Sequence, residues 1–412
     1  MRILIITYDW PPRNSIATHR PYSWAKYWSN NENQITVLTA KKKSYDEPLN
    51  LVLPFIDKLN VIEIDYGIQN LNSTFILEKL KLLKRYFNKY FSFTYDPRIG
   101  WLNAVKNNLN NYAINYDIII SSYPIDACHL IAHKIKLINP KILWVADYRD
   151  MWSISHLSKP SKILKRKELE TVGKNADIIT TISNELSIQL STFLNRDVHT
   201  ITNGFDMTEF QLENIIKREK LKSIPIKIVY TGMIYPGRRD PTLIISAISN
   251  IEKKLGLKNI FELSFYGTSS KTIKKFINID NCHFIHQCGF VTRDLAIQIQ
   301  NDADFVLLLE SEKEDAKGTL TGKLFEYMFS GTPIISIGSN ENSSIWKVLN
   351  TSKTGKCYMQ NLDELEKDLL LYLNNKKNDW FQPEINEILK FTRKRQAELL
   401  FNLIKNEYKI NI

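Results

Sequence analysis

Short apolar runs alternate with longer stretches of helical periodicity along almost the whole chain of 412 residues. The runs are rich in Ile, Val and Leu and show little alternation with polar residues, which is typical of parallel strands covered on both faces. In the first half of the chain the predicted strands are residues 2–7, 34–40, 60–65, 116–122, 141–147, 176–183 and 198–204. In the second half they are residues 226–232, 261–267, 282–291, 303–309 and 332–338.

A polar, charged stretch at residues 209–223 separates the two series of strands. Strands that alternate with helices on both sides of this stretch predict an α/β protein with two βαβ domains. We place the first domain at residues 1–205 and the second at residues 206–379. In such folds the ligand lies at the carboxyl ends of the strands.

Composition is that of an ordinary globular protein, with 43% apolar and 24% charged residues. The four cysteines are sparse, and the first apolar run is too short for a secretory signal, so we expect a reducing, cytoplasmic location. No window approaches the roughly 20 apolar residues that span a bilayer. Any contact with a membrane is therefore expected to be peripheral, at its cytoplasmic face.

The formal charge of +11 is unevenly distributed. Residues 1–205 contain 26 Lys and Arg against 18 Asp and Glu, a net of +8, while residues 206–412 contain 29 against 26, a net of +3. Anionic partners are therefore expected mainly at the first half. Charge alone does not distinguish nucleic acid, acidic lipid headgroups and phosphorylated substrates.

The segment GTLTGKLFEYMFSGTPII, residues 318–335, follows a predicted strand and a polar loop. A helix is predicted to begin near residues 321–323, where free N–H groups and the helix dipole form an anion site. Gly318 and Gly322 would let a phosphate approach the backbone closely. Lys323, in the first turn, adds a full positive charge, so the segment predicts a phosphate site.

Glu326 follows Lys323 after one helical turn. A carboxylate accepts two hydrogen bonds from a vicinal diol, and the ribose diol lies close to the phosphates of a nucleotide. Lys323 and Glu326 together therefore predict a site for phosphate plus ribose. The alternative is an exposed ion pair between the two side chains, worth about 0.2–0.5 kcal/mol. Gly331 is expected to end the helix and Pro333 to begin the next strand.

The segment GKLFEYMFSGTPII resembles the donor-binding signature of glycosyltransferase family 4 and its relatives. The resemblance covers most of the chain, because further motifs occur in the family's order: WPPRNS, ADYRDMW, ITNGFD, YTGMIYPGRRDP and CGFV, at residues 10–15, 146–152, 201–206, 230–241 and 288–291. It implies the GT-B fold, with two Rossmann-like domains facing across a cleft. The first domain would bind the acceptor and the second the donor, and residues 380–412 would cross back to the first domain.

The implied activity is retaining, metal-independent transfer of a sugar from a nucleoside diphosphate sugar to a cell-envelope glycan or a lipid-linked acceptor. No cofactor is expected, and nucleic acid is not an expected partner. Two rival functions stay open: a nucleotide-sugar 2-epimerase on the same fold, and a non-catalytic protein that uses the fold to bind anionic lipid or nucleic acid.

The resemblance also implies roles for individual residues in the second domain. Gly232, Arg238 and Arg239 would lie at the donor diphosphate, where Arg238 and Lys323 would stabilise the leaving group. Glu326 matches the family's ribose ligand.

Two positions differ from the family pattern. Gly318 stands where the family has another glutamate, so the contact to the donor sugar would come from backbone amides near Thr319 and Leu320, or from elsewhere. Met233 stands where a basic residue is common.

In the first domain the acceptor is expected near Arg13, Asn14 and Ser15, which follow the first strand. Asp150, directly after another strand, is the candidate carboxylate for orienting the acceptor, and an ion pair between Arg149 and Asp150 is the alternative. His129, on a predicted helix, is a candidate catalytic residue near the donor sugar. The alternative is a structural histidine in the core or at the surface.

Residues 78–93 form a predicted basic helix with interleaved aromatic residues, which suits an anionic membrane surface or a solvated helix packed on the domain. We predict no metal site. The sequence CHFIHQC, residues 282–288, contains two cysteines and two histidines, but alternate side chains of a strand face opposite ways and do not converge on one ion. The Asp302-Ala303-Asp304 triplet opens a predicted buried strand and is interpreted as structural.

Overall fold

The computed structural model of the chain describes residues 1–29, 33–43, 46, 48–66, 98, 100–123, 125–152, 162–206, 215, 224–234, 239–267, 282–311, 320–338, 340–341, 343–375 and 379–410. Three predictions fall outside these residues: the roles of Arg238, of Gly318 and Thr319, and of the helix at residues 78–93.

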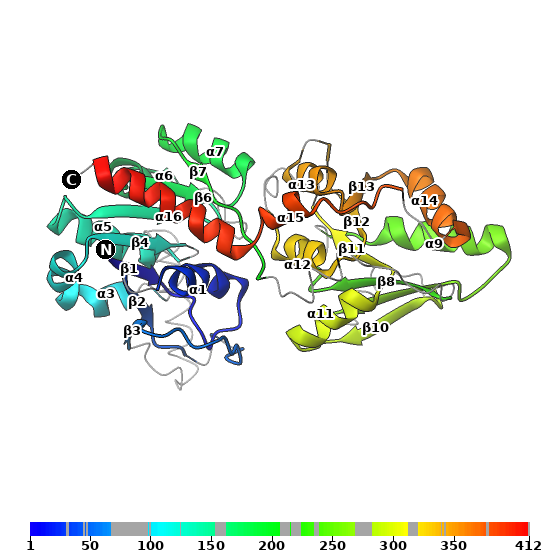
Figure 1. The fold of residues 1–412 in the computed structure, drawn as a ribbon, viewed down its shortest axis with the longest axis horizontal. Helices are drawn as coiled ribbons and strands as arrows, with labels where there is room; N and C mark the ends of the chain where they lie inside the picture. The colour runs from blue at the N-terminus through cyan, green and yellow to red at the C-terminus, as the bar shows by residue number, and fades with distance from the viewer. Residues whose placement is uncertain are drawn as a thin grey trace, which may run out of the picture. The chain divides into compact units, whose positions relative to one another are not determined.

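The chain folds into two compact units (Figure 1). The first unit comprises Met1–Thr202 together with Gln396–Ile412, and the second comprises Asn203–Arg395. The sequence predicts the division after residue 205, and the return to the first unit at residue 380 instead of Gln396.

The first unit contains a seven-stranded sheet in the order β3-β2-β1-β4-β5-β6-β7, with every strand pair parallel. This is the strand order of a doubly wound Rossmann sheet with one strand added. Its strands are β1 (Arg2–Thr7), β2 (Gln34–Ala40), β3 (Asn60–Ile64), β4 (Ile118–Ser122), β5 (Leu143–Asp147), β6 (Ile178–Thr181) and β7 (His199–Thr200).

The second unit contains a six-stranded parallel sheet in the order β10-β9-β8-β11-β12-β13. Its strands are β8 (Ile226–Thr231), β9 (Phe261–Tyr266), β10 (Ile285–Gly289), β11 (Phe305–Leu309), β12 (Ile334–Ile337) and β13 (Gly355–Met359). The two sheets confirm the predicted α/β class with two Rossmann-like domains. Strand β13 was not predicted, because its sequence GKCYM lacks a continuous apolar run.

Helices connect the strands in both units. Those of the first unit are α1 (Ile16–Trp28), α3 (Gly100–Val105), η3 (Lys106–Asn108), α4 (Leu109–Asn115), α5 (Asp126–Ile138), α6 (Lys162–Glu168), the π-helical turn η4 (Leu169–Gly173), α7 (Asn184–Leu194) and most of α16 (Arg393–Ile410). Those of the second are α9 (Thr242–Leu255), α11 (Arg293–Asp302), α12 (Gly322–Ser330), α13 (Ser344–Ser352), α14 (Leu362–Asn375) and α15 (Ile385–Leu389). Among the described helices, none is long and apolar enough to cross a bilayer.

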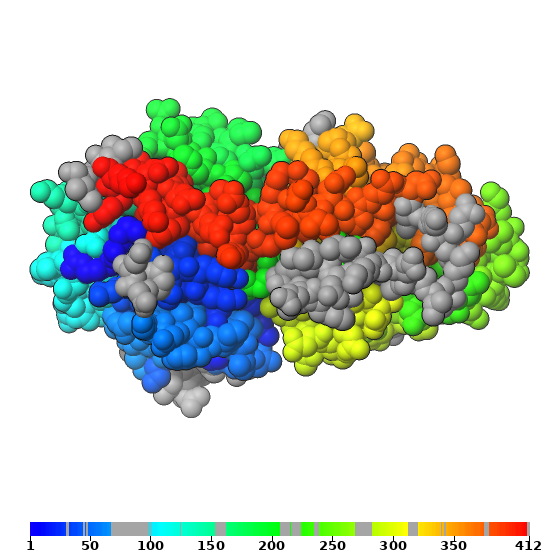
Figure 2. Space-filling model, in the orientation of Figure 1, coloured from blue at the N-terminus to red at the C-terminus, as the bar shows by residue number. Residues whose placement is uncertain are grey.

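The first sheet is covered on both faces, as its continuous apolar strands predict. In β1, Leu4 and Ile6 face a core shared with α3, α4 and α5, while Ile3 and Ile5 face a core shared with α1 and α16. Figure 1 shows α16 beside α1, and the Trp28 indole donates a hydrogen bond to the Ala397 carbonyl oxygen over 3.0 Å. The outer side of α16 lies on the surface of this unit (Figure 2). The C-terminal helix therefore completes the first unit, as the GT-B resemblance implied.

The second sheet is covered in the same way. In β11, Phe305, Leu307 and Leu309 face a core shared with α9 and α14, while Val306 and Leu308 face a core shared with α12 and α13. This packing fixes α12 beside the carboxyl ends of β8 and β11, where the candidate site begins.

Candidate functional site

Glycines follow the strands along the carboxyl edge of the second sheet. Gly232, Gly267 and Gly289 come directly after or at the end of β8, β9 and β10, with φ of 131°, 79° and 72°. A Cβ atom on Gly267 would lie 3.1 Å from the Cα atom of Gly232, so these two turns pack backbone against backbone. The edge therefore presents main chain and little side chain, which lets a polar ligand approach closely.

Lys323 lies against this glycine edge. Its Nζ atom donates a 2.7 Å hydrogen bond to the Tyr230 hydroxyl and lies 4.2 Å from the centre of the Tyr230 ring. A Cβ atom on Gly232 would collide with the end of the Lys323 side chain. The pKa of Lys323 is lowered to about 7, mainly by burial and also by the charge of Arg239, against the opposing charges of Glu310 and Glu326. The protein thus holds one partly desolvated amine at the start of α12.

Among the described residues, no side chain caps the N-terminus of α12. Thr321 occupies the N-cap position, but its hydroxyl donates to a Glu310 carboxylate oxygen over 3.3 Å instead of accepting from the first turn. A helix start of this kind leaves N–H groups available to an anion, with the positive end of the helix dipole behind them. The phosphate site stays a prediction, and this helix start is where it is expected.

Glu310 is a site residue that we did not predict. It directly follows β11, and burial raises the pKa of its carboxyl to about 7, against the opposing charges of Arg239 and Lys323. A Cβ atom on Gly338, which follows β12, would collide with the Glu310 carbonyl oxygen. The available indication in the sequence was a carboxylate immediately after the buried run FVLLL, at the edge where ligands of parallel sheets bind.

Glu326 lies one turn after Lys323, but the two side chains do not form the exposed ion pair that was the alternative prediction. Lys323 contacts Tyr230, whereas a Glu326 oxygen lies 3.4 Å from an Arg293 nitrogen. The side chains of Arg293 and Glu326 are 30% and 25% exposed. The Glu326 carboxylate is thus partly exposed, and its role as a diol ligand stays a prediction.

Two further predicted donor residues lie nearby. The Arg239 guanidinium donates to the Met233 carbonyl oxygen over 3.1 Å, and it is close enough to influence both Lys323 and Glu310. Leu320 is only 3% exposed, and its side chain packs in the core beneath α12. Leu320 therefore offers a ligand its backbone alone.

The carboxyl edge of the first sheet is built from charged side chains. Asp147, at the end of β5, is fully buried and accepts hydrogen bonds from Arg20 (2.7 Å), Ser122 (3.1 Å) and Thr180 (2.8 Å). Asp9 pairs with Arg13 at 3.1 Å. The Arg20–Asp147 pair was not predicted, since its members are 127 residues apart in the chain.

The loop after β1 is tied to the same network. Arg13 bonds Asp46 at 2.9 Å in addition to Asp9. Ser15 caps α1, and the Asn14 amide donates to the Asn50 side chain over 3.0 Å. These three residues, expected near an acceptor, are therefore also engaged in holding the loop.

Asp150 lies just beyond Asp147 and is partly exposed. The alternative prediction of an Arg149–Asp150 ion pair is wrong, because Arg149 forms no ion pair with any residue that the structure describes. The two charges still influence each other, since Asp150 raises the pKa of Arg149 against the lowering caused by burial.

His129 is fully buried on α5. Its Nδ1 atom lies 2.7 Å from the Ser121 hydroxyl, which also accepts a 2.8 Å hydrogen bond from the Trp144 indole. Burial lowers the pKa of His129 to about 3, so the ring is neutral. The other ring nitrogen is Nε2. That Nε2 atom is enclosed and has no partner among the described residues.

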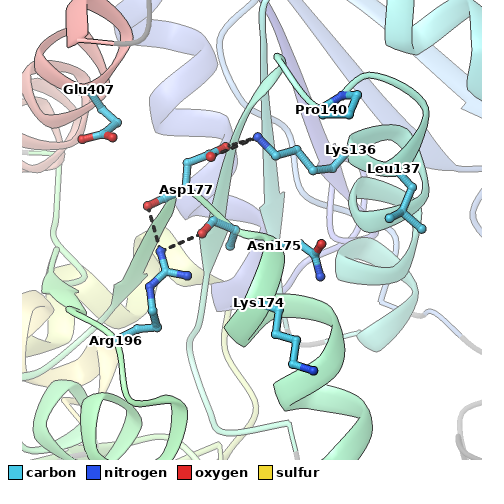
Figure 3. Close-up of a pocket in the computed structure, with 9 residues that line it drawn as sticks. Lys136, Leu137, Pro140, Lys174, Asn175, Asp177, Arg196 and Glu407 are labelled. Carbon is cyan, nitrogen blue, oxygen red and sulfur yellow. Dashed lines mark hydrogen bonds and ion pairs between the residues drawn. The ribbon is translucent and has the colours of Figure 1, made fainter.

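A separate pocket of about 520 Å³ lies at the amino end of β6 in the first unit (Figure 3). Its cations are already satisfied: Lys136 bonds Asp177 at 2.7 Å, and Arg196 donates to the Gly173 and Ala176 carbonyl oxygens over 2.8 and 2.9 Å. We assign no ligand to this pocket.

Within the described part of the chain, no group of three or more His, Cys, Asp or Glu residues is arranged to hold a metal ion. In the CHFIHQC segment, the His283 imidazole lies 2.9 Å from a Glu252 oxygen.

No protein-family model and no curated protein sequence matches the chain. Solved structures do match over nearly its whole length. HepE of Anabaena, solved with UDP-glucose, is 12% identical with a TM-score of 0.62, covering 98% of this chain and 100% of that chain. TarM is 11% identical with a TM-score of 0.59, covering 98% of each chain. UDP-GlcNAc 2-epimerase of Neisseria meningitidis, solved with UDP-GlcNAc, is 11% identical with a TM-score of 0.55, covering 98% of this chain and 100% of that chain.

The chain has the GT-B fold. At these identities the similarity establishes the fold and not the activity, because one fold serves many reactions. Membership of glycosyltransferase family 4 stays a prediction.

Proposed function

We propose that the chain is a glycosyltransferase that uses a nucleoside diphosphate sugar as donor. The observation that carries this proposal is the position of Lys323, held by Tyr230 at the uncapped start of α12 and against Gly232. A diphosphate placed there would meet the lysine ammonium, the first-turn N–H groups and a close glycine backbone. Glu326, one turn later, is then in reach of the ribose diol.

The chemical step transfers the sugar from the diphosphate to an acceptor hydroxyl. The bond between the anomeric carbon and the diphosphate oxygen breaks, and negative charge develops on the leaving diphosphate. In this proposal Lys323 and the N-terminus of α12 stabilise that charge. Because these groups do not have to rearrange during the reaction, they lower its barrier efficiently. By resemblance to family 4, Arg238 and Arg239 assist, no metal is needed, and the configuration at the anomeric carbon is retained. The acceptor hydroxyl attacks from the face that the diphosphate leaves, and a phosphate oxygen takes its proton.

We assign the acceptor to the first unit and infer a cell-envelope glycan or its lipid-linked precursor. Asp150 would orient the acceptor hydroxyl. His129 is placed near the donor sugar by the resemblance alone, and its ring is neutral because burial lowers its pKa to about 3. Contact of residues 78–93 with an anionic membrane is part of the same proposal.

The test is calorimetric titration of UDP, GDP, ADP and CMP, without added metal, into the wild type and the Lys323→Ala and Glu326→Ala variants. We expect one diphosphate to bind and each substitution to weaken it by about 10- to 100-fold, the cost of one hydrogen bond to a charged group. Lys347→Ala, which removes an exposed lysine from α13 of the same unit, is the matched control and should bind as the wild type. Failure of all four nucleotides at millimolar concentration would refute the donor site.

A nucleotide-sugar 2-epimerase is the second candidate. Two observations favour it: the similarity to UDP-GlcNAc 2-epimerase over 98% of this chain, and a carboxyl group, Glu310, whose pKa of about 7 suits acid–base chemistry. Incubation of the protein with the sugar nucleotide alone separates the two functions. An epimerase interconverts the sugar without a second substrate, whereas a transferase returns the sugar unchanged when no acceptor is present.

A further inference from the structure

Among the residues that the structure describes, none forms a hydrogen bond or an ion pair with Arg149. It lies just beyond β5, and its side chain is partly buried with an enclosed Nε atom. A guanidinium has five N–H donors, and here the enclosed Nε–H has no acceptor among the described residues.

Three carboxylates act on Arg149 through their charge, although none of the three forms an ion pair with it. Burial lowers the pKa of Arg149, while Asp150, Asp9 and Asp147 raise it through their charge. Asp147 is already bonded by Arg20, and Asp9 is already paired with Arg13. Arg20 also repels Arg149.

Enclosing a charged group without hydrogen bonds costs stability. Such groups therefore occur at sites where a ligand supplies the missing hydrogen-bond acceptors. The position of Arg149 agrees with this, because it follows a strand at the carboxyl edge of a doubly wound parallel sheet, where ligands of this architecture bind. The planar fork of a guanidinium matches the oxygen atoms of a phosphate, and residues 1–205 carry a net charge of +8 that favours a dianion.

We propose that Arg149 binds a phosphoryl group of the acceptor substrate. The assignment of this phosphoryl group to an acceptor rests on the proposed glycosyltransferase function, whereas the phosphoryl site itself does not depend on that function. The phosphate can be carried by a lipid or by a soluble sugar, and the two sources share the chemistry that Arg149 recognises.

The test uses methyl phosphate as the probe and calorimetry as the readout. All proteins carry Lys323→Ala, so that the donor site does not contribute. We expect methyl phosphate to bind this background, and Arg149→Gln to weaken the binding at least tenfold, with Arg149→Lys in between because lysine keeps the charge but loses the fork. Arg2→Gln, which removes an exposed arginine already paired with Asp117, is the matched control and should not change binding. Equal binding by the Arg149→Gln protein would overturn the proposal.

A stability measurement distinguishes a ligand residue from a structural one. Without phosphate, Arg149→Gln should melt at the same temperature as its parent or higher, because a partly buried charge that has no hydrogen-bonding partner among the described residues has been removed. Saturating methyl phosphate should then raise the melting temperature of the parent protein and not of the variant. If Arg149→Gln and Arg149→Lys both melt at a clearly lower temperature without phosphate, Arg149 is structural and the proposal is wrong.

Sedimentation with vesicles identifies the source of the phosphate. Arg149-dependent binding to phosphatidylcholine vesicles that contain phosphatidic acid, but not to phosphatidylcholine alone, indicates a lipid-borne phosphate. Methyl phosphate binding without such sedimentation indicates a soluble acceptor, and either result supports the site. If methyl phosphate requires Arg149 while none of the nucleoside diphosphates binds, the glycosyltransferase proposal fails and the phosphoryl site stands.

Discussion

The carboxyl edges of the two parallel sheets differ in the groups that they expose. In the second unit the edge is mostly backbone, because Gly232 and Gly267 pack against each other and Lys323 lies over Gly232. In the first unit the edge is mostly charged side chain, because Arg20 is bonded to the buried Asp147 and Arg13 joins Asp9 to Asp46. The same fold thus produces one edge open to a ligand's phosphates and another whose charges are already paired.

Because of this difference, we expect substitutions at one edge to affect mainly ligand binding and substitutions at the other to affect mainly the stability of the fold. On the glycine edge, the Tyr230 hydroxyl holds the amine of Lys323, and no described side chain caps the first turn of α12. A substitution there should therefore mainly affect ligand binding. On the charged edge, Asp147 has three hydrogen-bonding partners, so its loss should mainly affect folding. Arg149 is the exception on that edge.

The largest expected effect comes from breaking the charged edge. Asp147→Asn leaves the buried Arg20 without its counter-charge and should lower the free energy of unfolding by about 3–5 kcal/mol. Asp117→Asn breaks the exposed Arg2–Asp117 pair, in which the arginine side chain is 46% exposed, and should cost about 1 kcal/mol or less. Urea unfolding of both variants measures the difference. Equal losses of unfolding free energy in the two variants would show that the buried Arg20–Asp147 pair contributes no more to stability than the exposed pair.

The next effect comes from crowding the glycine edge. Gly232→Ala places a methyl group where the end of Lys323 lies, at a backbone φ of 131° that disfavours any other residue. We expect transfer to slow by about 100- to 1000-fold, as when one stabilising group is lost from a transition state. Gly256→Ala is the control, because φ there is also positive, at 64°, but the added methyl group meets nothing within 4 Å. An equal loss of activity in both variants would contradict the role of the Gly232–Lys323 contact.

The smallest expected effect is a pH dependence of nucleotide affinity, which tests the protonation of Lys323 and Glu310 at the glycine edge. The pKa of Lys323 and that of Glu310 both lie at about 7, so with rising pH the lysine loses its positive charge and the glutamate gains a negative one. Both changes disfavour a bound diphosphate. Nucleotide affinity should therefore fall above about pH 7, by about tenfold per pH unit for each group that has to change its protonation.

Variants assign that pH dependence. Lys323→Arg keeps its charge throughout this range and Glu310→Gln stays neutral, so each should flatten the calorimetric profile in part and the double variant almost completely. A profile that stays unchanged in both variants would place the titration elsewhere.

The strands and the donor segment were predictable from the sequence because their causes are local. Continuous apolar runs identified β1 and β11 within one or two residues, and the order of glycine, lysine and glutamate placed Lys323 and Glu326 on one helix. The end of α12 at Ser330 followed from Gly331, which adopts φ of 67°.

The missed features depend on contacts between distant parts of the chain. Nothing near Asp147 in the sequence indicates that Arg20 bonds it, and Glu310 gains its shifted pKa from burial in the folded unit. The ion pair expected between the neighbours Arg149 and Asp150 fails for the same reason. Residues adjacent in sequence after a strand end point in different directions, and only the fold decides what each one meets.

The most direct test of the account is a crystal structure of the protein with the nucleoside diphosphate that binds in the calorimetric screen. The account predicts the diphosphate at the first turn of α12, with an oxygen within hydrogen-bonding distance of Lys323 Nζ and the ribose hydroxyls at the Glu326 carboxylate. A nucleotide bound at the charged edge of the first sheet, or in the pocket beside Lys136 and Arg196, would contradict it.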